Sequence, residues 1–102
     1  MITITSKNIF DNQKFLGDTP AKDLIYKTGN FKIMRISLKK GLSIPVHQGT
    51  HVVVFFVLKG KGVFTSGSGE VELGENEYIS LDETEPRGIR SLEDLVVLAI
   101  RD

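Results

Sequence analysis

Residues 41–60 decide the fold, and they read GLSIPVHQGTHVVVFFVLKG. A glycine turn leads to two histidines, His47 and His51, which are followed by the apolar run Val52–Leu58 and a closing glycine. Successive side chains of a strand point to opposite faces, so this run predicts a strand that is buried on both faces. The histidines then lie at the mouth of a buried strand, which is where a binding site could form.

The rest of the chain repeats short apolar runs between turn signals rich in glycine. The clearest run is 31–39, where Met34, Ile36 and Leu38 alternate with Arg35, Ser37 and Lys39. This period of two is typical of strands, and no segment shows a sustained helical period. Short strands at regular spacing predict an all-β sandwich or barrel, and the dipeptide Gly29-Asn30 predicts a hairpin turn.

Composition excludes several classes of function. The chain has 102 residues, 13 basic and 13 acidic, so no electrostatic attraction to nucleic acid or anionic lipid is expected. It has no cysteine, which excludes disulfides, thiolate metal sites and a thiol nucleophile. The N-terminus lacks a signal-peptide pattern, and the longest apolar run is too short to span a membrane. We therefore expect a cytoplasmic protein.

The stretch 41–60 resembles the first sequence motif of the cupin family of small β-barrels. That motif is Gly, five residues, His, one residue, His, three or four residues, Glu, six residues, Gly. Gly41, His47 and Gly60 match it. The position of the second histidine is Gly49 and that of the glutamate is Val53.

A second cupin motif, Gly, five residues, Pro, one residue, Gly, two residues, His, three residues, Asn, is matched more weakly. Gly74 matches the first glycine. The proline, glycine, histidine and asparagine positions are Ser80, Asp82, Glu85 and Ile89. The resemblance therefore lies in the rhythm of strands and turns rather than in the metal ligands.

The resemblance implies an all-β fold, a small antiparallel β-barrel of the jelly-roll or double-stranded β-helix type. It covers residues 31–100, which would form the barrel core of a single domain spanning 1–102. Residues 1–20 would be an extended N-terminal segment. The outward face of the strand at Val52–Leu58 needs a cover, which could be a second sheet, the N-terminal segment or another subunit. We expect a homodimer, and the alternative is a strand covered within the monomer.

In the family, three histidines and one carboxylate typically hold a divalent metal inside the barrel. Only His47 keeps its residue type here. If no bulge intervenes, alternation points His51 inward as well, and His47, His51 and Glu85 could form a two-histidine, one-carboxylate site for iron, manganese, nickel, copper or zinc. The alternative is that His51 caps the rim and that Glu85 lies in an exposed acidic loop, 82–85.

Without a metal, the barrel could still bind a small molecule. The candidate ligand-binding residues are His47, His51, Val53, Phe55 and Glu85, which combine an apolar wall with a few polar groups. His47 and Glu85 are also candidates for an acid–base pair. Two functions therefore compete. The lost metal ligands favour a binding module that needs no cofactor, and the alternative is a metal-dependent dioxygenase, isomerase or decarboxylase.

Two further sets of residues, the aromatic side chains and the arginines, have more than one possible role. A purely structural protein would have its pocket blocked by an aromatic side chain such as Phe55 or Phe64. Arg35, Arg87 and Arg90 could bind an anionic substrate or lie on the solvent side of the sheet. For Arg35 the solvent side is favoured.

Overall fold

The structure, a computed structural model, describes residues 5–102, which form nine strands and no helix. The strands are β1 (Ala21–Lys27), β2 (Lys32–Leu38), β3 (Ser43–His47), β4 (Val53–Lys59), β5 (Gly62–Ser66), β6 (Gly69–Leu73), β7 (Tyr78–Leu81), β8 (Arg87–Ser91) and β9 (Leu95–Arg101). The prediction of an all-β fold is confirmed. The described residues contain no helix of the length and apolarity needed to cross a membrane.

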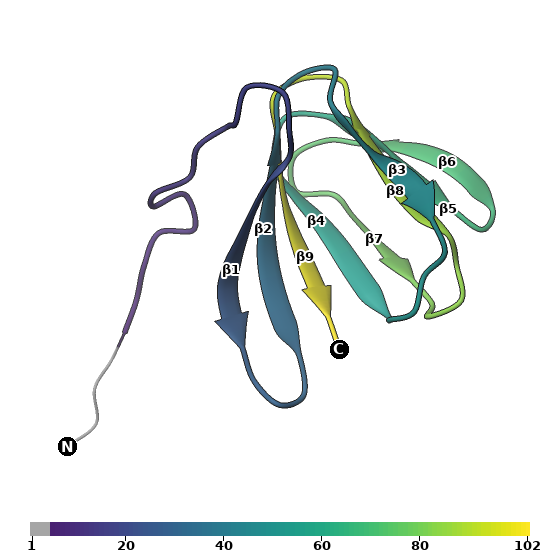
Figure 1. Cartoon of the computed structure of the whole chain (residues 1–102), viewed down its shortest axis with the longest axis horizontal. Coiled ribbons are helices and arrows are strands. Elements are labelled where there is room, and N and C mark those ends of the chain that lie inside the picture. The colour runs from purple at the N-terminus through teal and green to yellow at the C-terminus, as the bar shows by residue number, and fades with distance from the viewer. Residues whose placement is uncertain (1–4) are drawn as a thin grey trace.

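The strands form two antiparallel sheets that face each other (Figure 1). One sheet has five strands in the order β1-β2-β9-β4-β7, and the other has four in the order β3-β8-β5-β6. The predicted Gly29-Asn30 turn joins β1 to β2, where the amide of Thr28 donates to the carbonyl of Phe31 across 2.9 Å. The last strand, β9, lies between β2 and β4 in the middle of the larger sheet.

Strand β4 shows why the two sheets stay together. Val53, Phe55 and Val57 alternate toward the space between the sheets and are buried, with exposed fractions of 3%, 7% and 0%. Phe55 contacts Phe64 of the opposite sheet, with ring centroids 5.8 Å apart. Burying each such side chain stabilises the fold by about 1.5–3 kcal/mol, so this one strand supplies a large part of the core.

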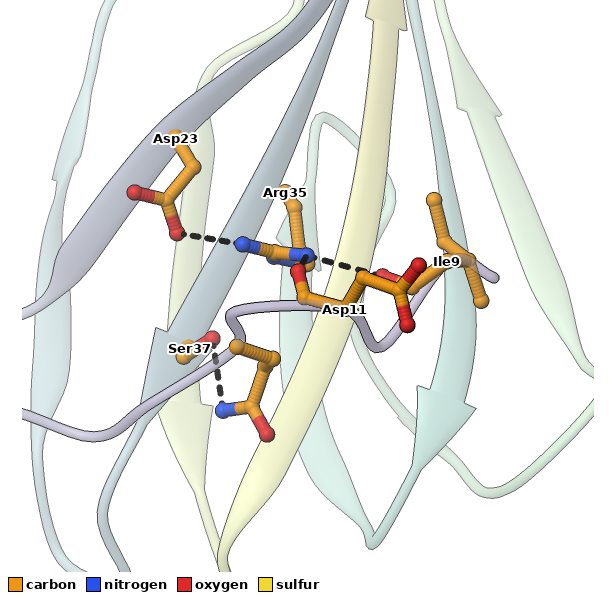
Figure 2. Close-up of polar contacts among 6 residues, drawn as sticks. Ile9, Asp11, Asp23, Arg35 and Ser37 are labelled. Atoms are coloured by element: carbon orange, nitrogen blue, oxygen red, sulfur yellow. Dashed lines mark hydrogen bonds and ion pairs between the residues drawn. The ribbon is translucent and has the colours of Figure 1, made fainter. Parts of the chain in front are cut away.

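The N-terminal segment covers the outer face of the larger sheet beside β2 (Figure 2). Arg35 points to this face, and its Nη1 donates to the carbonyls of Ile9 and Asp11, both at 2.8 Å. Its Nη2 pairs with Asp23 at 3.0 Å. The predicted outward direction of Arg35 is therefore confirmed, but the predicted solvent exposure is wrong: only 4% of the residue is exposed, because the segment lies over it.

Further along the segment, Gln13 Nε2 donates to Ser37 Oγ at 3.1 Å. The outward side chains of β4 (Val54, Phe56 and Leu58) are only half-buried in the single chain. Part of the cover for the outer face thus comes from the N-terminal segment. The homodimer that would cover the rest of this outer face stays a prediction.

Replacing Arg35 with methionine should release the N-terminal segment. The carbonyls of Ile9 and Asp11 would lose their donor, and the lost charge-assisted hydrogen bonds should cost about 2–4 kcal/mol. Denaturant unfolding measures the cost, and trypsin cleavage after Lys7 and Lys14 measures the release.

Arg90→Met is the matched control, because Arg90 is exposed and pairs with the exposed Glu70 at 3.4 Å. It should change stability by less than about 1 kcal/mol. Equal losses for the two variants, with unchanged cleavage of the segment, would contradict the anchoring role of Arg35.

Candidate functional site

A cavity of about 400 Å³ opens between the two sheets. Its floor is apolar and its mouth carries basic and polar side chains from both sheets and from the loop between β3 and β4. Its lining includes Lys22, Lys32, Met34, Ile44, His47, Gly49, His51, Val53, Phe55, Arg87, Ala99 and Arg101.

A bulge in β3 brings His47 to the cavity. Ile44 pairs with Ile89 of β8, but His47, three residues later, pairs with Arg87, only two residues back along β8. The extra residue lets both Ile44 and His47 face the cavity, although strict alternation would place them on opposite faces. His47 Nδ1 lies 3.0 Å from the carbonyl oxygen of Pro45. When Nδ1–H donates there, Nε2 is left as an acceptor.

Arg87 stands opposite His47 and is 93% buried, with an exposed fraction of 7%. Its Nη2 donates to the carbonyls of Asp82 (2.9 Å) and Glu85 (3.2 Å). Among the described residues, the ion pairs involve Arg35, His51 and Arg90, and none involves Arg87. The guanidinium is thus held by neutral carbonyls at the cavity wall, with its charge uncompensated by any described carboxylate.

Gly49 makes room for this guanidinium. It is buried, and a Cβ atom added to it would overlap Arg87 Nη2 and the carbonyl oxygen of Glu85. Gly49 stands at the position of the second histidine in the cupin motif, and a side chain there would clash with Arg87. The space beside it is filled by an arginine from the opposite strand.

The structure brings together four of the five predicted ligand-binding residues. His47, His51, Val53 and Phe55 all line the cavity. Glu85 does not. Its side chain lies toward the β5–β6 hairpin, where a Cβ on Gly67 would be 3.5 Å from Glu85 Cγ.

His51 lies at the rim, as the alternative interpretation of the sequence proposed. Its Nδ1 is 3.6 Å from Asp102 Oδ1, and its side chain is 44% exposed. It is therefore a cavity-lining group whose nearest charged partner is at the chain's C-terminal end, and it does not share a partner with His47.

The donor set does not fit the metal that the fold family implies. Within residues 5–102, no three or more His, Asp or Glu side chains are grouped so that they could hold a metal ion. His47, His51 and Glu85 are therefore not brought together as a ligand set. The residue opposite His47 is a guanidinium cation, which would repel a divalent cation placed between them.

Four basic residues complete the site, and they are Lys22, Lys32, Arg87 and Arg101. From the sequence, Arg87 was a candidate for an anion site, and the other three were not assigned to the site. Lys32 continues the alternation of Met34 and Ile36 on β2, so its cavity-facing direction could have been read from the sequence. Arg87 had two open interpretations. Its place depends on the β3 bulge and the loop at 82–86, which no spacing rule reveals.

No protein-family model matches the sequence, and no curated protein matches it either. Solved structures do resemble it. An RmlC-like cupin protein from Desulfovibrio desulfuricans is 24% identical and superposes with a TM-score of 0.86, covering 97% of this chain and 96% of its own.

Two other solved structures also superpose on most of this chain. A cupin superfamily protein from Desulfitobacterium hafniense is 12% identical with a TM-score of 0.85, covering 99% of this chain and 93% of its own. KdgF from Halomonas is 15% identical with a TM-score of 0.82, covering 96% and 93%. At these identities the likeness concerns the fold.

Gly49→Ala should destabilise the protein by about 1–3 kcal/mol, because the new methyl group must displace the buried guanidinium or the loop carbonyl. Thermal or denaturant unfolding measures the loss. Gly17→Ala is the matched control, since nothing lies within 4 Å of a Cβ there. A cost as small as that of the control would show that Arg87 moves aside freely.

Protein purified without a chelator or a histidine tag should retain far less than one equivalent of iron, manganese, nickel, copper or zinc. The physical reason is the guanidinium opposite His47 together with the absence of a grouped donor set among the described residues. Elemental analysis checks this. One equivalent that is lost in a His47→Ala, His51→Ala double variant would contradict it.

Proposed function

Because the chain has the cupin fold, we propose that it binds a small organic molecule in the cavity between its two sheets, without a metal ion. The observation that carries this proposal is the cavity itself. Its volume of about 400 Å³ lies within the range of small-molecule sites, which is roughly 300–1,000 Å³. An apolar floor with a few polar groups at the mouth is the usual composition of such sites.

The aromatic side chains that could have closed the cavity leave it open. Phe64 is fully buried in the core, and Phe55 forms part of the cavity wall. A purely structural role, which predicted a blocked pocket, is therefore less well supported than binding.

The alternative, a metal-dependent dioxygenase, isomerase or decarboxylase built on His47, His51 and Glu85, finds less support. The side chain of Glu85 lies away from the cavity wall, and Arg87 occupies the position opposite His47. His47 keeps a nitrogen that could transfer a proton at the mouth. A proton-transfer role would be an addition to binding rather than a replacement for it.

A screen of small organic fragments by amide chemical-shift mapping tests the proposal. Binding fragments should shift the resonances of Gly88, Ile89 and Phe55, which line the cavity. Ala99→Met should weaken their binding by about fivefold or more, because the flexible side chain fills part of the floor.

Val71→Met is the matched control, since Val71 lies on β6 and is 41% exposed. It should leave fragment binding unchanged. If no fragment shifts the cavity resonances, or if Ala99→Met changes nothing, the cavity is not the binding site and the proposal fails.

A further inference from the structure

The cavity collects positive charge and no negative charge. Lys22, Lys32, Arg87 and Arg101 line it together with both histidines, and no aspartate or glutamate of residues 5–102 lines it. A carboxylate, that of Asp102, lies beside it, 3.6 Å from His51 Nδ1 at the rim. The whole chain has as many acidic as basic residues. The two signs are therefore segregated, and the cationic excess is concentrated where a ligand would sit.

The strand register places two of these cations directly beside each other. Lys32 of β2 pairs with Arg101 of β9, and Lys27 of β1 pairs with Lys32 in turn. Like charges in directly opposite positions destabilise a sheet. Among the described residues, no carboxylate forms an ion pair with any of the three.

Arg87 is the most buried of the four cations, and its charge is the most costly to desolvate. The Arg87 residue is 93% buried, so its guanidinium has lost much of its hydration, and hydrogen bonds to neutral carbonyls replace only part of it. Its Nε and Nη2 both reach the carbonyl of Glu85, at 3.4 and 3.2 Å. Among the described residues, Nε and Nη2 account for the hydrogen bonds of this guanidinium, and Arg87 lines the cavity, so an acceptor bound there could take up the Nη1 hydrogens.

We propose that the ligand is a small organic anion whose charged headgroup docks on Arg87 and whose apolar body lies on the floor of the cavity. This inference rests on the proposed function. Lys32 and Arg101 at the mouth would draw the anion in, and His47 would lie beside the headgroup because it stands opposite Arg87. The floor, which includes Met34, Phe55 and Ala99, offers an apolar body a surface that a bare inorganic anion could not use.

A carboxylate is the headgroup that fits this arrangement best. Guanidinium and carboxylate form strong charge-assisted hydrogen bonds, and a carboxylate is small enough to share the mouth with the imidazole of His47. A phosphate monoester has the same chemistry with more charge and more volume. The experiment separates the two.

Amide chemical-shift titrations with 4-phenylbutyrate, 4-phenylbutanamide and phenyl phosphate test the inference. The acid and the amide have nearly the same shape, so the difference between them measures the recognition of charge. The acid should bind about tenfold or more tightly than the amide, as expected for a charge-assisted hydrogen bond to a buried arginine. It should also bind more tightly than phenyl phosphate.

Arg87→Gln should abolish the preference for the acid, while Arg90→Gln should preserve it. Arg90 is the matched control because it lies on the same strand, is exposed and pairs with Glu70. Arg87 also ties down the loop through Asp82 and Glu85, so Arg87→Gln could fail to fold. The double variant Lys32→Gln, Arg101→Gln leaves that loop intact, and it should lower the preference by about threefold to tenfold.

The outcomes separate the two proposals. Equal binding of acid and amide, or a preference that survives both Arg87→Gln and the double variant, overturns the inference and leaves the binding function standing. Tighter binding of phenyl phosphate than of 4-phenylbutyrate overturns the choice of carboxylate. Failure of all three probes to shift the cavity resonances overturns the inference, and failure of the wider fragment screen as well overturns the proposed function.

Discussion

The buried guanidinium of Arg87 is the constraint on which the site depends. Removing a charge from water is costly, so the surrounding residues must supply hydrogen-bond acceptors for the guanidinium and leave space for it. The loop carbonyls of Asp82 and Glu85 supply the partners, Gly49 supplies the room, and the bulge in β3 aligns His47 with it across the sheet.

Much of the fold could be predicted from short stretches of sequence. The apolar run that forms β4 and the strict alternation in β2 predict which side chains point into the core, because side chains of a strand alternate between its two faces. The comparisons confirm the cupin resemblance for the fold. The cover over Arg35 could not be foreseen, since nothing in an irregular segment reveals which carbonyls it will offer to a residue 24 or 26 positions away.

The site was less predictable for a specific physical reason. Motif spacing counts residues along the chain, and it placed Glu85 at the family's second-motif histidine. The register instead places Arg87 opposite His47, because one strand carries an extra residue and the loop before β8 turns the Glu85 side chain toward the β5–β6 hairpin. In the same way, a formal charge of zero concealed a cavity with four basic residues, because a sum over the chain carries no information about where charges meet.

The position of β9 has a consequence for how the protein acquires its shape. The ninth strand, β9, is the middle strand of the larger sheet, and it pairs with β2 along seven consecutive residues and with β4 on its other side. Until that strand leaves the ribosome, β2 and β4 have no common neighbour, and their apolar faces stay exposed to water. The larger sheet can therefore form only after the chain has been made through Arg101, and contacts between such distant segments make its folding slow. Before β9 is added, the unpaired edges of β2 and β4 can pair with other chains.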